Sequence, residues 1–494
     1  MTRPATVRRF ILGGSFSSLL AIVMIKAMGF AESVFVARII GADGFGLLTL
    51  VLSLTNIMIA VATLGVPPAV TKFLAGEVAK SSQGSRSTLN MAVRLVALSS
   101  AAVCVVVGLI GYFLLAPYYS NPALLNLLII AVIFVGLTAP LIPFANALQG
   151  LGKITQLNRV SVAGAALGLG FAVVLAIALA EKGALIAFLV GSAMPGFLAF
   201  RYVRQGIRNL PNREPATPVS AKSLLNYGLP NLLAGITVLA ALYVMSSWLA
   251  VNSGFIDLGN FAVASSLAAV IGLIPSAMGI PLFPILSSLN VSDPMRGRAL
   301  VPRAMRITTF VSVPIVVIVV VFAQEIIGVA YGPQFAAASP LLAILATSAL
   351  IASVTGVVGS QIAGSGKMWL GLEINLLWVA AVIGSAATLI PRFGAVGASL
   401  ATLTGYAVLG LILIIVGKRK LFLSFDGVIV PAAWSLGFVG MALVLEFFGG
   451  NMRIQAGIGV TLLSILSISV LLRGDEQQLV REVLVLLGLH RRSF

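Results

Sequence analysis

Long apolar segments, separated by short polar or glycine-containing breaks, run through nearly the whole chain. A helix needs about 20 apolar residues to cross a bilayer. Because these segments are continuous rather than alternating, they predict membrane helices and not the strands of a β-barrel. Fourteen spans are predicted, at residues 10–37, 46–73, 91–116, 124–148, 155–180, 184–203, 225–251, 261–286, 304–327, 340–363, 368–390, 395–416, 428–448 and 454–472.

The break between the first two spans is a glycine-rich stretch, residues 37–46. Gly41, Gly44 and Gly46 can adopt positive φ without steric cost, which predicts a tight reversal of the chain. Arg38 and Asp43 are polar and suit a membrane–water boundary. The stretch therefore reads as a hairpin corner between two membrane helices.

Features of the first half recur in the second half at a nearly constant offset. The pairs at an offset of 213 are Gly41 and Gly254, Gly46 and Gly259, Pro68 and Pro281, and Tyr118 and Tyr331. Residues 150–153 match residues 364–367 at an offset of 214, and Gly183 matches Gly394 at 211. Each pair lies at the equivalent place in or between equivalent spans, so the pattern indicates an internal repeat of six spans.

An even number of spans gives both copies the same membrane orientation, as in transporters built from parallel repeats with the substrate path between lobes. The predicted fold is an all-α polytopic membrane protein with two six-helix lobes in pseudo-two-fold relation and two additional helices. The predicted parts are an N-lobe at 1–204, a linker at 205–224, a C-lobe at 225–417, the last two spans at 418–473 and a tail at 474–494. The spacing of apolar residues in the tail fits either an amphipathic helix on the inner leaflet or a soluble helix.

The basic residues test this topology, since cytoplasmic loops are enriched in Lys and Arg. With a cytoplasmic N-terminus, the fourteen spans put 26 of the 31 basic residues on the cytoplasmic side and both termini there as well. The net charge of +17 is therefore largely a topology signal, and we expect no nucleic-acid partner. The predicted location is the cell (cytoplasmic or inner) membrane.

Composition also limits the possible chemistry. Charged residues are 9% of the chain and hydrophobic residues 59%, unlike a soluble domain. The single cysteine, Cys104, and the single histidine, His490, argue against a disulfide, a metal site or histidine catalysis. Residues 364–368 lack the glycine and the Ser/Thr of a P-loop. No paired acid/base set is visible, so we expect no enzyme, no catalytic residue, no metal and no cofactor.

Residues 37–48 resemble the first-hairpin signature of the polysaccharide biosynthesis (O-antigen flippase-like) proteins, in the multidrug/oligosaccharidyl-lipid/polysaccharide exporter superfamily. Residues 64–73, 331–338 and 391–398 are similar to later segments of that family. The resemblance implies two six-helix lobes around a cavity and alternating access. It implies a flippase or exporter for a lipid-linked oligosaccharide or polysaccharide precursor. The second copy departs from the first, since Val251 stands opposite Arg38.

The expected partners are a polyprenyl-(pyro)phosphate-linked saccharide and membrane lipids, with H⁺ or Na⁺ as possible coupling ions. A multidrug or cation antiporter of the same superfamily and a lipid II flippase are alternatives. The antiporter predicts acidic groups inside the lobes, whereas this sequence leans basic. A membrane-embedded enzyme is a further alternative, but it would need clustered carboxylates or a large loop domain.

Charged residues inside spans are costly and are therefore candidates for function. The candidate substrate-binding residues are Lys26, Glu32, Arg94, Arg159 and Glu373. The candidate conformational or hinge residues are Arg38, Gly41, Asp43, Gly46, Pro68 and Pro281. Lys26 fits a cationic contact for a phosphate headgroup or an ion pair between helices. Arg94 and Arg159 fit snorkelling side chains or a cavity mouth, and Glu373 fits a proton or cation site.

Overall fold

The computed structural model describes residues 4–79, 85–119, 121–208, 219–272, 286, 289, 293–365, 367–423, 425–445 and 450–471. Every regular element within these ranges is a helix. Eight of the described helices are long and apolar enough to cross a membrane. The prediction of an all-α polytopic membrane protein is confirmed.

The chain divides into two compact units, residues 1–259 and 260–494. The elements that begin in the first unit are α1 (Pro4–Thr63), α2 (Val66–Ala79), α3 (Ser85–Ile110), the π-helix η1 (Gly111–Leu115), α4 (Ala116–Tyr119), α5 (Pro122–Thr138), the 3₁₀-helix η2 (Ala139–Leu141), α6 (Ile142–Gly150), α7 (Ile154–Arg208), α8 (Ala221–Ser253) and α9 (Phe255–Ile271). The boundary falls after α8, which the predicted lobes assigned to the second half. The cause is packing, since α8 lies against α1 and α2. The lobe division itself stays a prediction.

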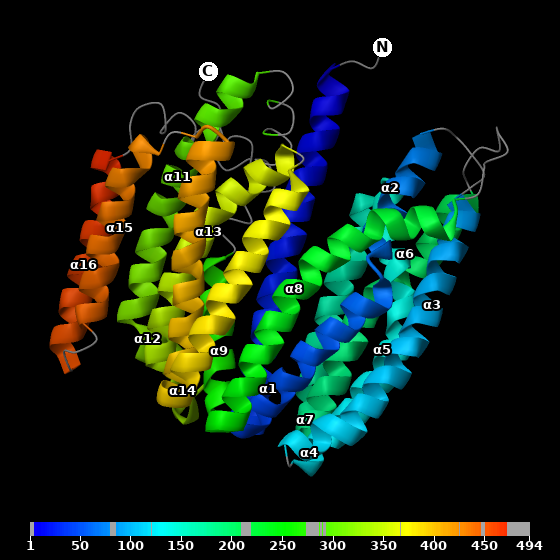
Figure 1. Ribbon diagram of the computed structural model, residues 1–494, viewed down its shortest axis with the longest axis horizontal. Coiled ribbons are helices and arrows are strands. Elements are labelled where there is room, and N and C mark those ends of the chain that lie inside the picture. The colour runs from blue at the N-terminus through cyan, green and yellow to red at the C-terminus, as the bar shows by residue number, and fades with distance from the viewer. Residues whose placement is uncertain are drawn as a thin grey trace. The chain divides into compact units, whose positions relative to one another are not determined.

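The first predicted corner is a single residue within α1. Gly41 has φ 73° and ψ −179°, and the residues on both sides of it are helical. Figure 1 shows the chain turning back at this point, so that α1 forms two helical arms. Of the three glycines in the corner, Gly41 supplies the positive φ. Gly44 and Gly46 are buried and helical.

The second arm of α1 ends at another backbone irregularity. Leu64 and Gly65 both have positive φ, of 51° and 66°, and α2 starts at Val66. Pro68, a candidate hinge residue, lies in the first turn of α2, where the missing N–H of a proline has no consequence. The break belongs to Leu64 and Gly65 instead.

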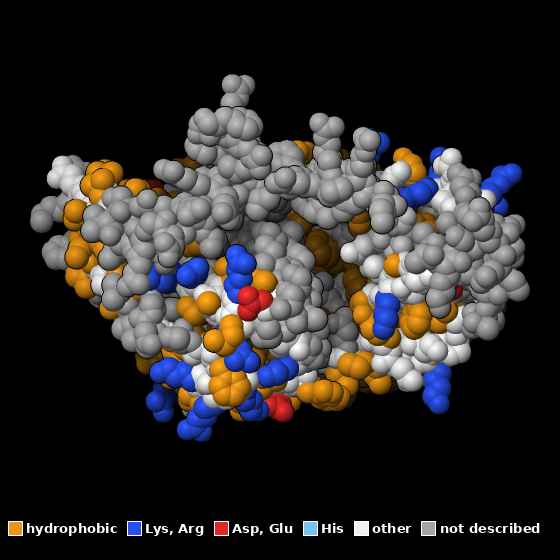
Figure 2. All heavy atoms as spheres, turned by 90° about the horizontal axis from the view of Figure 1, so that it is seen from above, with side chains coloured by type: hydrophobic (Ala, Val, Ile, Leu, Met, Phe, Trp, Pro, Cys, Tyr) orange, Lys and Arg blue, Asp and Glu red, His pale blue; other side chains and the backbone are white. Residues whose placement is uncertain are grey.

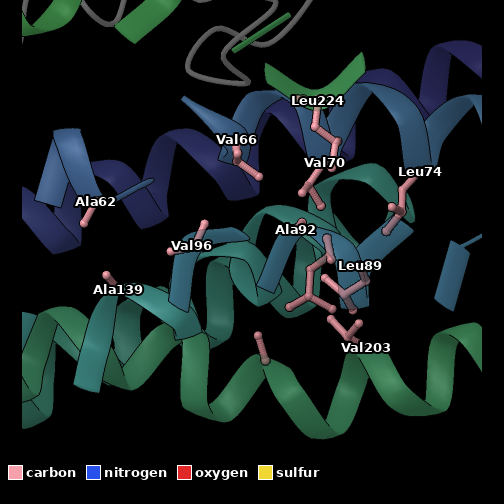
Figure 3. Close-up of a cluster of buried hydrophobic side chains, with 14 of the residues drawn as sticks. Ala62, Val66, Val70, Leu74, Leu89, Ala92, Val96, Ala139, Val203 and Leu224 are labelled. Atoms are coloured by element: carbon pink, nitrogen blue, oxygen red, sulfur yellow. The ribbon is translucent and has the colours of Figure 1, made fainter. Parts of the chain in front are cut away.

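A buried apolar cluster holds α2 against its neighbours in the first unit (Figure 3). Side chains of α2, α3 and α7 meet in it, and Leu224 reaches it from α8. Lipid is as apolar as these side chains, so close packing rather than the hydrophobic effect has to hold membrane helices together. The labelled members in Figure 3 are Ala62, Val66, Val70, Leu74, Leu89, Ala92, Val96, Ala139, Val203 and Leu224.

The elements of the second unit are α11 (Pro294–Val321), α12 (Ala323–Ala330), the 3₁₀-helix η3 (Pro333–Phe335), α13 (Ala338–Gly364), α14 (Met368–Lys420), α15 (Asp426–Leu445) and α16 (Gly450–Leu471). The predicted ninth span, 304–327, is divided between α11 and α12 near Phe322. The helices α15 and α16 pack against α11. Arg453 of α16, which is buried, forms an ion pair with Glu325 of α12.

The long helices α7 and α14 reverse in the same way in the two units. Ala180 has φ 50° and ψ −130°, and Gly394 has φ 52° and ψ −129°. A Cβ atom on Gly183 would overlap the carbonyl oxygen of Leu175, and one on Gly397 would overlap that of Leu389. The structural counterpart of Gly183 is therefore Gly397, at an offset of 214, and the predicted pairing of Gly183 with Gly394 was wrong.

The turns before α7 and α14 repeat as well. The amide of Leu151 donates to the carbonyl of Ala147, and the amide of Ser365 donates to that of Gln361, 214 residues further on. Lys153 Nζ donates to the Tyr202 carbonyl at 3.5 Å, and Lys367 Nζ to the Lys420 carbonyl at 3.0 Å. In each unit a lysine thus joins this turn to the end of the following long helix.

Two predicted segments lie wholly or partly outside the described residues. The tail at 474–494 is not described. Of the predicted linker at 205–224, residues 209–218 are not described, while α7 continues to Arg208 and α8 begins at Ala221. Both helices therefore reach into the predicted linker.

Candidate functional site

The glycine corner at residues 37–46 has an equivalent, a second corner at residues 250–259. The two glycine corners contact each other within the first unit. A Cβ atom on Gly46 would overlap the backbone carbonyl of Phe255, and a Cβ atom on Gly259 would overlap that of Ala42. Ala42 and Phe255 are themselves 213 residues apart and so occupy equivalent positions in the two corners. The glycine of each corner therefore contacts the same carbonyl position in the other corner. Gly254 has φ 88° and ψ 171°, close to the conformation of Gly41. This reciprocity is what a local two-fold axis produces.

A group of hydroxyls lies beside the corner contact. Tyr119 of α4 donates a hydrogen bond to Ser247 Oγ of α8, and its hydroxyl lies 3.4 Å from that of Tyr243. The ring of Tyr119 also lies 6.5 Å from that of Phe255. The turn between α3 and α5 is therefore tied to α8 next to the corners. Sequence reasoning missed this cluster because its partners are more than 120 residues apart.

The two charged residues predicted inside the first span have different surroundings. Lys26 is exposed, and Glu32 is half-buried. Glu32 Oε2 lies 3.8 Å from the position that a Cβ atom would take on Gly168 of α7. Neither side chain has an ion pair or hydrogen bond with another residue in the part of the chain that the structure describes. The ion pair between helices considered for Lys26 has no counterpart there.

Arg38 and Asp43 flank the reversal at Gly41, and both side chains are exposed. Gly44, which follows Asp43 in the chain and is buried, contacts α7 instead. A Cβ atom on Gly44 would lie 2.7 Å from Glu181 Oε1, at the corner of α7. The polar residues of this stretch thus face outward while its glycines make the close contacts.

The remaining charged candidates lie apart from this corner in the chain. Arg94 is exposed in the first half of α3, and Arg159 is exposed in the second turn of α7. Glu373 is 64% exposed and lies 3.6 Å from Lys420 Nζ in an ion pair. A surface ion pair of this kind is a weak indicator of a cation site.

Of the two candidate hinge prolines, Pro68 is half-buried in the first turn of α2, and Pro281 lies outside the described residues. The close contact in this region belongs to glycines. A Cβ atom on Gly65 would overlap the Gly228 carbonyl of α8, and one on Gly228 would lie very near the Gly65 carbonyl. The helix carrying the first corner therefore meets α8 again further along.

Another polar contact that sequence reasoning missed joins α2 to α3. Thr88 Oγ1 donates to Glu77 Oε1 at 2.6 Å, and both residues are buried. An acid and a threonine 11 residues apart on different helices give no local sequence signal.

Among the side chains coloured by type, the view in Figure 2 shows many of Lys and Arg and few of Asp or Glu. A concentration of basic residues at one end of a set of apolar helices is typical of the cytoplasmic side of a membrane protein.

These features define a class, a polytopic helical membrane protein with repeated helical hairpins. The fold resembles that of the lipid II flippase MurJ in an inward closed conformation, with a TM-score of 0.71 and 13% identity over 90% of this chain and 97% of that chain. It also resembles an inward-facing multidrug resistance MATE family transporter of the MOP superfamily, with a TM-score of 0.62 and 15% identity over 81% of this chain and 94% of that one.

The chain belongs to the polysaccharide biosynthesis protein family, whose profile matches residues 35–340. This confirms the family that the hairpin signature indicated. A curated relative, the probable low-salt glycan biosynthesis flippase Agl15 of Haloferax volcanii, is 23% identical over 190 residues. That match covers 38% of this chain and 40% of the relative.

Proposed function

We propose that this protein is a flippase that moves a lipid-linked oligosaccharide or polysaccharide precursor across the cytoplasmic membrane by alternating access. The observation that carries the proposal is the reciprocal contact of the two glycine corners, Gly46 on Phe255 and Gly259 on Ala42. Alternating access needs a seam between equivalent elements that closes on one side of the membrane, and this contact has that form. Family membership supports the saccharide precursor as the cargo.

The proposed topology has fourteen spans, arranged as two six-helix lobes and two further helices. Three of the eight long apolar helices contain a reversal, and three shorter apolar helices accompany them among the described residues. Counting each reversed helix as two spans gives fourteen, which supports this arrangement. The bias of basic residues supports both termini on the cytoplasmic side and the two corners at the outer rim.

Within this proposal Lys26 contacts the phosphate or pyrophosphate of the lipid carrier. It supplies an exposed ammonium in the arm of α1 that leads to the corner. Glu32, Arg94 and Arg159 are kept as further candidate contacts. Arg38 and Asp43 act in the conformational change at the rim. Glu373 is the weakest candidate for the cargo or for H⁺ or Na⁺, because it is exposed and paired with Lys420.

The test is reconstitution into vesicles with a labelled polyprenyl-pyrophosphate oligosaccharide, measuring its movement between leaflets. Protein-dependent movement is expected. Parallel vesicles carrying lipid II or a cationic drug separate the two alternatives, a lipid II flippase and an antiporter. Glu32 is the residue that favours the antiporter, since it is a half-buried carboxylate. Drug efflux driven by an ion gradient, without movement of any lipid-linked saccharide, would overturn the proposal.

A further inference from the structure

An open depression of about 530 Å³ lies where the two ends of α14 come together in the second unit. They meet because the chain reverses at Gly394. Lys367, Trp369 and Glu373 line it from the beginning of α14, and Arg419, Lys420 and Phe422 from its end. The depression is therefore both basic and aromatic, and it has no part in the corner contact.

Its three cations are not equally engaged. Lys367 Nζ donates to the Lys420 carbonyl at 3.0 Å, and Lys420 Nζ pairs with Glu373 at 3.6 Å. Arg419 has no hydrogen bond or ion pair with any other residue in the described ranges. One carboxylate against three cations leaves an excess of positive charge, and the guanidinium of Arg419 presents a planar set of donors suited to a phosphate.

Phe422 stands in a conformation that favours glycine. Its φ is 54°, and the residue is 67% exposed. Leu421 and Leu423 on either side are buried, and the Leu423 amide donates to the Gly417 carbonyl at 2.9 Å. The backbone is thus fixed by its buried neighbours and holds an aromatic ring outward at a conformational cost. The positive φ itself belongs to the end of α14, where a Schellman motif prefers glycine, and the presence of an exposed phenylalanine there points to a role for its ring.

A second aromatic ring and a further cation complete the site. Trp369 is 72% exposed beside the depression. The guanidinium of Arg298 lies 5.2 Å from the centroid of the Phe422 ring. Exposed aromatic rings next to Lys and Arg are typical of the level of the lipid headgroups. The charge count places this end of α14 at the cytoplasmic surface, where anionic lipids attract basic residues.

The equivalent turn of the first unit lacks these features. At the offset of 214, Thr155 replaces Trp369 and Arg159 replaces Glu373. The lysine is kept, since Lys153 bonds to a carbonyl near the end of α7. The lysine therefore belongs to the repeated fold, whereas aromatic rings at these two positions are specific to the second copy, since Arg208 stands at the position of Phe422. The fold alone does not account for them.

We propose that this depression binds the phosphate group of an anionic membrane lipid at the cytoplasmic surface. Arg419 and Lys420 contact the phosphate, and Trp369 and Phe422 contact the glycerol and the first methylenes of the acyl chains. A free phosphate ion has the same charge but offers nothing to the rings. Binding of lipid at this site is measured without transport, so it can be tested independently of the proposed transport activity.

The experiment uses the purified full-length protein in a neutral detergent and measures binding of short-chain phosphatidylglycerol by native mass spectrometry. Phosphatidylcholine and inorganic phosphate are the comparison ligands. The double variant Arg419→Gln/Lys420→Gln is expected to weaken phosphatidylglycerol binding by about tenfold or more. Lys418→Gln is the matched control, because Lys418 is exposed in the same helix turn and does not line the depression.

Equal loss of binding in Lys418→Gln would indicate a non-specific surface charge effect and overturn the site. Competition by inorganic phosphate at the same concentration would overturn the lipid as its source. Equal binding of phosphatidylcholine would overturn the role of the charges.

Phe422→Gly supplies a test that a structural role cannot imitate. Glycine relieves the positive φ, so the unfolding temperature should rise, while phosphatidylglycerol binding should weaken. If the variant is more stable and its affinity for phosphatidylglycerol is unchanged, the Phe422 ring does not contribute to lipid binding. A variant that is less stable would show that Phe422 serves the fold.

Discussion

The two glycine corners have the same backbone conformation but different side chains. Gly41 and Gly254 take nearly the same positive-φ conformation, and Gly46 and Gly259 each meet the carbonyl of the other corner. Arg38 and Asp43, however, stand opposite Val251 and Ile256. The close contact depends on the backbone and is symmetric, whereas the arginine is present on one side only, and the acidic residue of the second corner, Asp257, lies opposite Gly44. In the proposed mechanism the symmetric backbone contact opens and closes, and Arg38 acts on that movement from one side only.

The largest effect should come from breaking the symmetric contact. Gly46→Ala/Gly259→Ala adds two methyl groups that overlap backbone carbonyls, which no side-chain rotation can relieve. An overlap of this kind costs about 1–3 kcal/mol, which corresponds to about a 5- to 150-fold change in the closed population. We expect a loss of flux of that size in the vesicle assay.

Gly29→Ala is the control for this change. Gly29 lies on the same helix as Gly46, and a Cβ atom there meets nothing within 4 Å. An equal loss of flux in Gly29→Ala, or normal flux in the double variant, would remove the corner contact from the mechanism.

Lys26 tests the asymmetric side of the comparison. Its position in the second half is held by Leu239, so the charge has no symmetric counterpart. Loss of a hydrogen bond to a charged group costs about 1.5–3 kcal/mol, so Lys26→Ala should lower flux by about 10- to 100-fold. Membrane insertion, measured as the yield of folded protein, should be unchanged. Flux in Leu239→Ala should stay near normal, and wild-type flux in Lys26→Ala would show that the lysine does not contact the cargo.

The hydroxyl cluster beside the corners should have a smaller effect. Tyr119→Phe keeps the ring next to Phe255 but removes the hydrogen bond to Ser247. A neutral hydrogen bond contributes about 1 kcal/mol, so the variant should shift flux by about fivefold. Tyr118→Phe is the matched control, since Tyr118 is exposed. If both variants behave alike, the cluster does not stabilise the closed corner.

Arg38 should have the smallest effect of the set. Arg38 is exposed at the rim, and exposed charge pairs contribute about 0.2–1 kcal/mol. Arg38→Gln should therefore lower the maximal flux by no more than about fivefold, with the apparent affinity for cargo unchanged. A change confined to the apparent affinity would instead assign Arg38 to cargo binding. Val251→Gln, at the equivalent position, shows whether polarity there has any effect of its own.

The fold was readable from the sequence where local physics decides it. The apolar segments predicted the helices, and the glycine at 41 predicted a reversal that requires positive φ. The predicted span at 46–73 ran through the break at Leu64 and Gly65, because Leu64 normally prefers negative φ and gives no signal of a break. Gly183 was paired with Gly394 because adjacent Gly-Ala pairs look alike, and the carbonyl contact of Gly397 corrects the register.

The site was less readable, because its contacts join distant segments. Nothing near Tyr119 in the sequence indicates Ser247, and nothing near Glu325 indicates Arg453. The charged candidates were chosen for their rarity inside spans, which identifies them without giving their partners. Glu373 illustrates the limit, since its partner Lys420 lies 47 residues away at the other end of α14.

The proposed mechanism requires the two corners to close on each other and to separate during transport. Spin labels at Ile39→Cys and Asn252→Cys, two exposed symmetric positions next to the corners, report their separation in a Cys104→Ala background. In vesicles at rest, pulsed electron paramagnetic resonance should give one short distance between the two spin labels. During turnover with the lipid-linked saccharide, a second and longer distance should appear. A single unchanged distance in vesicles that transport the cargo would contradict the account.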